Sequence, residues 1–264
     1  MHLNLLISCM HQKDASIIKN SNVQTDVVIV NQCDTESVEE FDFVNKKGRT
    51  CHAKFICTTE RGLSKSRNMA IRNAWGDVCL LCDDDEYFVD DVEDLILGAF
   101  SENPKTALIA FALKRNDIDK TYPKEKSVLK FKQILKTSSL QLAFSREQLI
   151  KHHILFDEKM GSGTGNGGGE ENMFIFSFKR KGLKMLYYPS VIAIVNPGDS
   201  QWFHGYDEKF FINMGWANRR ILGSIVSFIY LLYWPIFRRS VYQDSNISIL
   251  KVYKCLLKGF FLTR

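Results

Sequence analysis

The most prominent polar cluster in the sequence is the run Asp83-Asp84-Asp85-Glu86, which directly follows the apolar segment at residues 77–82. Adjacent carboxylates repel one another unless a cation lies among them, and such oxygen ligands suit a hard divalent ion. Asp83 and Asp85 are expected to point to the same side, because side chains alternate along a strand. The run therefore predicts a metal site that bridges to phosphate groups, with a solvated acidic turn as the alternative.

A second candidate site combines the glycine-rich residues 161–169 with the carboxylates of Glu170 and Glu171. The segment contains the spacing GxGxxG, but no strand immediately precedes it and it lacks the ending of a P-loop. We therefore expect a flexible lid or an acceptor-facing loop. A carboxylate beside such a loop suits a general base that deprotonates a hydroxyl, while a favourable contact with the helix dipole is the alternative.

Arg67 lies on the apolar face of a predicted helix, in register with Ile71 and Ala74. A cation on that face needs an anionic partner, which phosphate or the aspartate cluster can supply. The spacing alone is almost equally consistent with a structural ion pair. Cys79 and Cys82 are expected to be buried structural thiols, because residues three apart on a strand face opposite sides.

Strands and helices alternate over the first two hundred residues, which predicts an α/β fold with a mostly parallel sheet and helices on both faces. The principal strands are expected at residues 3–9, 26–31, 54–58, 77–82, 106–113, 140–144, 185–188 and 191–195. The helices are expected at residues 13–19, 64–75, 89–100 and 172–181. Ligands bind beyond the carboxyl ends of the strands in such sheets, which is where the acidic run is placed.

The chain has a nearly neutral body and a basic, apolar tail. Its 264 residues are 45% hydrophobic, which supports a substantial core and excludes a disordered or fibrous protein. Residues 219–264 contain eight Lys and Arg residues and a single acid, Asp244, while residues 221–237 carry no charge. This combination favours an anionic membrane surface as a partner and argues against nucleic acid.

The uncharged stretch is shorter than the ~20 residues that span a membrane, so we expect a helix that lies on the membrane surface. Tyr230, Tyr233 and Trp234 suit that interface. We accordingly expect a catalytic domain at residues 1–200 and a helical, membrane-associating extension at residues 201–264. The start of the chain has no secretory signal, and seven scattered cysteines fit no disulfide framework. A cytoplasmic protein on the inner face of the cell membrane is therefore expected.

Taken together, these segments resemble the family-2 glycosyltransferases of the GT-A fold. The first block of the resemblance comprises residues 61–71, residues 74–77 and the DxD motif in the run Asp83-Asp84-Asp85-Glu86. The second block comprises residues 156–161 and Gly169-Glu170-Glu171. The resemblance covers about residues 3–200, and the two blocks together are more specific than either alone. It implies a Rossmann-like GT-A sheet that binds a nucleotide-sugar.

The resemblance also implies roles for individual residues. Asp85 would be the principal ligand of Mn²⁺ or Mg²⁺, and Asp83 would serve the metal or the nucleotide. Glu171 lies where the family has its catalytic aspartate, and Glu170 is the second candidate for the general base. Asn196 stands where relatives often carry a histidine. The residues placed around the nucleotide-sugar are Ser8, Gln32, Arg67, Asp83 and Asp84.

The expected activity is that of an inverting, metal-dependent glycosyltransferase of the hexosyltransferase type. It would move a sugar from a nucleotide-sugar, expected to be a UDP-sugar, to a hydroxyl of a lipid-linked saccharide in cell-surface polysaccharide synthesis. A sugar-phosphate nucleotidylyltransferase would require a glycine-rich, lysine-bearing loop after the first strand, where this chain has Ser8-Cys9-Met10-His11. A non-catalytic, membrane-associated protein that binds nucleotide-sugars is the other alternative.

Overall fold

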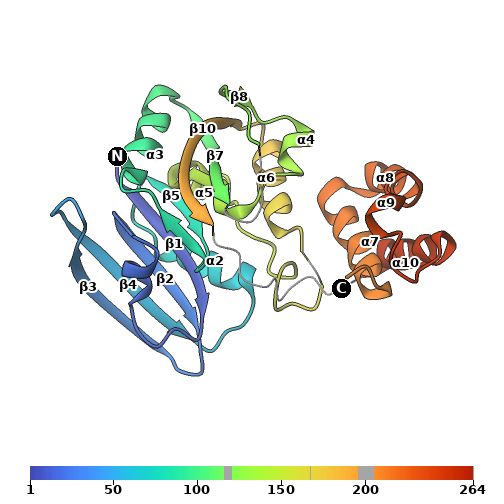
Figure 1. Ribbon diagram of the computed structural model, residues 1–264, viewed down its shortest axis with the longest axis horizontal. Coiled ribbons are helices and arrows are strands. Elements are labelled where there is room, and N and C mark those ends of the chain that lie inside the picture. The colour runs from blue at the N-terminus through green and yellow to red at the C-terminus, as the bar shows by residue number, and fades with distance from the viewer. Residues whose placement is uncertain (116–120, 167, 196–204, 264) are drawn as a thin grey trace.

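The computed structural model describes residues 1–115, 121–166, 168–195 and 205–263, and it shows one large sheet with helices around it (Figure 1). The strands are β1 (Leu3–Met10), β2 (Asp26–Gln32), β3 (Ser37–Val44), β4 (Thr50–Thr58), β5 (Val78–Cys82), β6 (Glu86–Phe88), β7 (Thr106–Arg115), β8 (Ser127–Val128), β9 (Leu142–Ser145) and β10 (Lys184–Val195). The helices before residue 200 are α1 (Ile17–Asn20), α2 (Leu63–Asn73), α3 (Val92–Glu102), α4 (Phe131–Ile134), η1 (Ser139–Gln141), α5 (Arg146–Lys151) and α6 (Glu170–Arg180). Those after it are α7 (Glu208–Leu222), α8 (Ser224–Phe237), α9 (Arg239–Tyr242) and α10 (Ile249–Phe261).

The strand order is β3-β4-β2-β1-β5-β9-β7-β10-β6, with β8 paired to β10. Pairing is parallel through β4, β2, β1 and β5 and again between β7 and β10. The α/β class is confirmed, but the sheet is mixed, because β9 pairs antiparallel with both β5 and β7. The carboxyl ends of β4, β2, β1 and β5 meet at one edge, which positions the residues that follow them for ligand binding.

Helices cover both faces of the sheet, as the alternating pattern predicted. Along β1, Leu6 packs into a core that also contains buried residues of α2 and α6. Leu5 and Ile7 point to the opposite face, where they pack with α1 and α3. All three side chains are fully buried, so both faces of this central strand lie away from water.

Four strands differ from the sequence-based expectation: β3, β6 and β8 were not predicted, and β10 was predicted as two strands. Strand β3 was not predicted, because it is an edge strand whose side chains are largely exposed and whose pattern is weakly apolar. Strand β10 was predicted as two strands around Pro189, but it is continuous in the structure. Its pairing with β7 shifts register between Tyr188 and Val191, so the proline lies at an irregularity that tolerates a missing backbone donor.

The helices after residue 205 lie together at the side of the molecule opposite β3 (Figure 1). They enclose a core of their own, in which Phe211 of α7 packs with Trp234 and Tyr242. Helices α7 and α10 approach so closely that a Cβ atom on Gly215 would lie 2.1 Å from the carbonyl oxygen of Leu256. Glycine is therefore required where the two backbones touch.

The tail differs from the single surface helix that was expected. Ile221 belongs to α7 and is buried in the main core, and Gly223 separates α7 from α8. Trp234 is only 8% exposed, so its expected place at a membrane interface is wrong, whereas Tyr233 is exposed. In the part of the chain that the structure describes, no helix combines the length and apolarity needed to cross a membrane.

Candidate functional site

The acidic run begins where β5 ends, at the edge formed by the carboxyl ends of the parallel strands. The strand stops at Cys82, and Asp84 and Asp85 lie in a turn. The argument that strand alternation places Asp83 and Asp85 on one side is therefore wrong. Asp84 accepts a hydrogen bond from Gln12 Nε2 at 3.3 Å, which links the turn to the segment after β1.

Arg67 is the cation that lies among these carboxylates. Its Nη2 atom donates to both oxygens of Asp83, at 3.0 and 3.3 Å, and to Ser139 Oγ at 2.8 Å. Its Nη1 atom lies 3.3 Å from Glu170 Oε1. Burial opposes the charge of this side chain, but Asp83 and Glu170 outweigh that effect and raise the pKa of Arg67. The structure thus shows the ion pair that the spacing allowed, while contact between Arg67 and a nucleotide stays a prediction.

Asp85 is the best-placed carboxylate for a divalent cation. Its Oδ1 atom is buried and has no hydrogen-bond partner among the described residues. Burial and repulsion from Asp83 raise the pKa of Asp85, so a cation at this oxygen would relieve an unfavourable arrangement. Within the described ranges, no group of three or more His, Cys, Asp or Glu side chains is arranged to hold a metal ion. Asp85 and the partly exposed Asp83 nevertheless fit a metal whose remaining ligands are water and substrate phosphates.

Glu170 and Glu171 stand in different environments at the start of α6. Glu170 is 6% exposed and is held by Arg67, with its Oε2 atom lacking a hydrogen-bond partner among the described residues. Glu171 is partly exposed. Desolvation and the neighbouring Glu170 raise the pKa of Glu171 to about 8. A carboxylate with such a pKa is a stronger base than an ordinary one.

Both glutamates line a cavity of about 810 Å³. One wall is the glycine-rich loop, which Leu63 and Ser64 hold at its base through hydrogen bonds to the carbonyls of Ser162 and Met160. The opposite wall comes from α7 and α8, and includes Asn213, Ala217, Asn218, Ile221 and Tyr230. A cavity of this size accommodates a sugar ring with part of the molecule that carries it.

The remaining predicted nucleotide residues lie near the same edge of the sheet. Ser8 is on β1, and its hydroxyl is buried without a hydrogen-bond partner among the described residues. Gln32 ends β2, and its Oε1 atom accepts the N–H of Gly62 at 2.7 Å, so this oxygen positions the start of α2. Asn196 lies outside the described residues.

The structure therefore joins the two candidate sites through a single side chain. Arg67 connects Asp83, at the end of β5, with Glu170, at the start of α6. Sequence reasoning missed Ser139, which completes the Arg67 contacts, and it missed the contribution of α7 to the cavity wall. Neither has a local signal in the sequence, because both depend on contacts between distant segments.

Comparison with known proteins identifies the family. The sequence model of glycosyl transferase family 2 matches residues 15–163, which is more than half of the chain. The chain belongs to glycosyl transferase family 2. It is therefore a glycosyltransferase, as the order and spacing of its motifs predicted. No curated protein sequence matches it at a significant level.

Solved structures show the GT-A fold of this family-2 glycosyltransferase. TarS of S. aureus (residues 1–349), in complex with UDP-GlcNAc, is 15% identical with a TM-score of 0.66. That match covers 98% of this chain and 79% of TarS 1–349. The mannosyltransferase PcManGT from Pyrobaculum calidifontis, in complex with GDP-Man and Mn²⁺, is 12% identical with a TM-score of 0.52, covering 98% and 73% of the two chains. At these identities the likeness concerns the fold.

Proposed function

We propose that this protein is an inverting, metal-dependent glycosyltransferase that transfers a sugar from a UDP-sugar to a hydroxyl group of a lipid-linked saccharide. The observation that carries the proposal is the chain of contacts from Asp83 through Arg67 to Glu170, with Glu171 beside it on the cavity wall. These contacts support a phosphate-binding edge that lies next to the proposed base. Structural relatives bound to UDP-GlcNAc and to GDP-Man with Mn²⁺ support the same class of donor.

Glu171 is the general base in this proposal. Glu170 is 6% exposed and its Oε1 atom is held by the buried guanidinium of Arg67, so this carboxylate is less accessible to an acceptor than that of Glu171. Glu171 is one residue further along α6, is partly exposed, and lines the cavity. Its pKa of about 8 makes it a strong proton acceptor once it is ionised.

The residues at the end of β5 hold the donor side. Asp85 and Asp83 would bind Mn²⁺ or Mg²⁺, which when bound neutralises the charge of the diphosphate leaving group. Ser8 and Gln32 lie at the same edge and would face the nucleotide. Arg67 keeps Asp83 in place and compensates its charge inside the protein.

The transfer step conserves atoms and charge. Glu171 takes the proton of the acceptor hydroxyl, and the hydroxyl oxygen forms a bond to the anomeric carbon of the donor sugar. The bond between that carbon and the diphosphate oxygen breaks at the same time, and the leaving nucleoside diphosphate takes the electron pair. Attack from the face opposite the leaving group inverts the anomeric configuration.

An exposed apolar face on α8 supports a membrane-bound acceptor. Ile225 is 79% exposed and Ile229 is 63% exposed, and both lie on a stripe with further exposed apolar residues, namely Val226, Leu232, Tyr233, Ile236 and Phe237. Arg238 follows this stripe, and Lys254 and Lys258 are exposed on α10. An apolar stripe with basic neighbours suits an anionic membrane surface.

In this proposal the protein lies on the inner face of the cell membrane and acts in cell-surface polysaccharide synthesis. Residues 1–200 form the catalytic domain and residues 201–264 the membrane-associating extension. That division stays a prediction.

A donor-panel assay tests the proposed activity. The full chain is incubated with UDP-sugars or GDP-mannose and a lipid-linked saccharide extract, with Mn²⁺ or with a chelator. We expect metal-dependent release of nucleoside diphosphate together with an elongated acceptor, and neither product with Glu171→Gln. Donor binding without turnover for any acceptor would instead support the non-catalytic alternative.

A further inference from the structure

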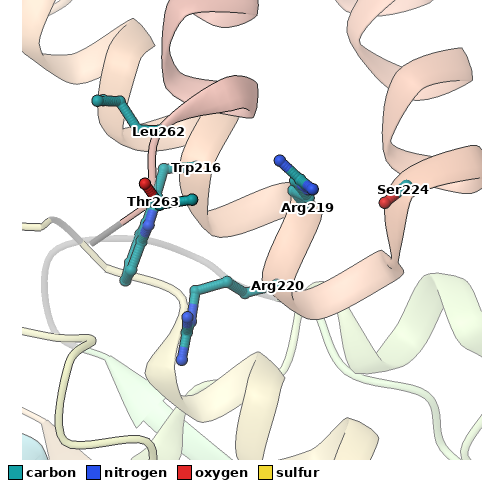
Figure 2. Close-up of a pocket in the computed structure, with 6 residues that line it drawn as sticks. All are labelled: Trp216, Arg219, Arg220, Ser224, Leu262 and Thr263. Atoms are coloured by element: carbon teal, nitrogen blue, oxygen red, sulfur yellow. The ribbon is translucent and has the colours of Figure 1, made fainter.

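A second cavity, of about 350 Å³, lies on another side of α7 from the glutamates. Figure 2 shows its lining residues, which come from α7, the first residue of α8 and the end of the chain after α10. These residues are Trp216, Arg219, Arg220, Ser224, Leu262 and Thr263. Two neighbouring arginines at a cavity wall attract an anion, and the donor site does not use them.

Arg219 supplies a positive charge to this cavity. Its Nη1 atom donates to the carbonyl oxygen of Phe260 at 2.7 Å, and its guanidinium lies 5.1 Å from the centre of the Phe260 ring. Among the described residues, no carboxylate forms an ion pair with Arg219. The guanidinium has five N–H donors, so the contact with Phe260 fixes its position and leaves further donors for a ligand.

Arg220 is positioned by two other contacts. It forms an ion pair with Asp157, and its guanidinium lies 4.9 Å from the centre of the Trp216 ring. The pair with Asp157 is approximately neutral, so among the described lining residues the net charge comes from Arg219. A planar guanidinium that is held in place binds the oxygens of a phosphate with little loss of entropy.

The start of α8 adds a third positive element. Ser224 is its first residue, and the helix has neither a side-chain cap nor an acidic residue in its first turn. The first backbone N–H groups of a helix have no acceptor within the helix, and this end of the helix dipole attracts anions. A phosphate beside Arg219 and Ser224 would satisfy donors from two elements at once.

The surface next to this cavity is apolar. Ile225 directly follows Ser224 and is 79% exposed, and the exposed stripe of α8 continues from it. An anion that binds here therefore meets charge on one side and an apolar surface on the other. This combination matches an amphiphile with a phosphate head better than it matches a soluble anion.

We propose that this cavity binds the phosphate group of a lipid. The source is either the headgroup of a membrane phospholipid or the phosphate that joins a lipid-linked acceptor to its saccharide. The second source rests on the proposed function, in which a lipid-linked saccharide is the acceptor. Helix α7 also forms a wall of the cavity that contains Glu171, so one acceptor could reach both cavities. The ligand would then contact both sides of one helix.

Calorimetric titration of the full chain with inorganic phosphate and with inorganic pyrophosphate, in the presence of a chelator, tests the site. We expect binding that Arg219→Gln weakens ~10-fold or more, because a charged hydrogen-bonding group is lost. Arg219→Lys keeps the charge and should weaken it less. Arg238→Gln removes an equal charge outside the cavity, and Asp85→Asn alters the donor site, so both should leave the binding unchanged.

The same titration can overturn the proposal. No binding to the wild-type chain, or equal weakening by Arg219→Gln and Arg238→Gln, contradicts a specific site. These measurements need no turnover, so a chain that binds phosphate without transferring sugar would contradict the proposed function alone.

Two further experiments distinguish a membrane headgroup from a lipid-linked acceptor as the source of the phosphate. Loss of flotation with phosphatidylglycerol vesicles in Arg219→Gln, beyond that in Arg238→Gln, assigns the site to a membrane headgroup. A higher KM for the lipid-linked acceptor, with the KM for the donor and the flotation unchanged, assigns it to the acceptor.

Discussion

The Nη1 atom of Arg67 lies 3.3 Å from the Oε1 atom of Glu170, and both side chains are buried. This ion pair ties α2 to the first residue of α6 and so fixes the direction in which α6 begins. Glu171, the next residue, is thereby held at the cavity wall. Arg67 thus positions Glu171, the residue that we propose as the base, even though its own side chain is almost inaccessible.

Arg67→Met is expected to destabilise the protein strongly. Removing one member of a buried ion pair leaves the other charge uncompensated, which typically costs ~3–5 kcal/mol of unfolding free energy. Urea unfolding followed by circular dichroism measures the loss. The double variant Arg67→Met with Glu170→Gln should recover part of it, because the buried carboxylate is then neutral. No recovery would contradict the inferred contribution of this pair.

Glu171→Gln should bind the donor normally and transfer sugar ~10²–10⁴-fold more slowly, because a positioned general base is lost. For the wild-type enzyme, kcat/KM should rise with pH up to about 8, because below that pH the carboxyl is protonated and cannot accept the acceptor proton. Initial rates between pH 6 and 9 give the profile. Glu170→Gln is the matched variant, and a dead Glu170→Gln beside an active Glu171→Gln would reverse the assignment.

Glu171 should also make stability depend on pH. Its pKa lies above the ordinary value of 4.5 in the folded chain, so folding binds a proton between these pH values. The unfolding free energy therefore falls as the pH rises from about 4.5 to about 8. Glu171→Gln removes this effect and should have the higher Tm above pH 8, with each kcal/mol adding ~2–4 °C. Equal Tm values for the two proteins across this range would contradict the raised pKa.

Much of the central sheet could be predicted from the sequence, because its strands are continuous apolar runs. Residues 27–31 and 78–82 are buried on both faces, and a strand buried in this way is a continuous apolar run in any fold. Pairing of Arg67 with Asp83 was one of two predicted outcomes. Its contact with Ser139 and the separation of Glu170 from Glu171 into two environments were not predictable, because they depend on how distant helices meet.

Asp85→Asn is expected to abolish metal-dependent transfer while the protein remains folded. Its unpartnered oxygen contributes no hydrogen bond to the fold, so the Tm should change little. Activity as a function of Mn²⁺ concentration, measured beside thermal unfolding, separates the two effects. Asp90→Asn is the matched control, because Asp90 pairs with Lys46 at the surface. Full wild-type activity in excess chelator would contradict a metal role for Asp85.

Gly161→Ala should lower activity more than Gly165→Ala. Both glycines have positive φ, but a Cβ atom on Gly161 would lie 3.2 Å from the side chain of Glu170, whereas Gly165 has open space. The alanine would therefore displace Glu170 and with it the start of α6. Initial rates of the two variants give the comparison, and equal losses would indicate that only the backbone conformation matters.

The glycine-rich loop is expected to close over a bound substrate. Hydrogen exchange across residues 161–169, measured with and without nucleotide-sugar, should show greater protection in the complex. Protection that is the same in both states would count against a lid.

Ile229→Asp, on the apolar stripe of α8, should weaken binding to anionic vesicles, because it places a charge on the surface that we propose meets the lipid. Val38→Asp is the matched control, since Val38 is 60% exposed but lies on β3. Vesicle flotation at low and high salt measures both variants. Equal flotation of Ile229→Asp and the wild type would contradict the membrane surface assigned to α8.

The tail shows where sequence patterns stop being informative. Its uncharged stretch predicted one helix, but Gly223 divides it, and Ile221 is drawn into the main core. On α10, Lys251 pairs with Glu208 of α7 at 3.0 Å. Helix α10 is amphipathic, since Val252 and Leu256 are buried while Lys254 and Lys258 are exposed.

Helix α7 belongs to two cores, which restricts how this chain can recombine with relatives. Ile221 and the Asp157 partner Arg220 bind α7 to the catalytic side, while Gly215 holds it against Leu256 of α10. In a chimaera joined before α7, the contacts of α7 with the catalytic side would be formed between segments of two different proteins. In a chimaera joined at Gly223, the same would hold for the contacts of α7 with α10. A functional chimaera therefore needs α7 together with a surface that matches it, either on the catalytic side or on α10. The C-terminal helices cannot be exchanged between relatives as an independent unit.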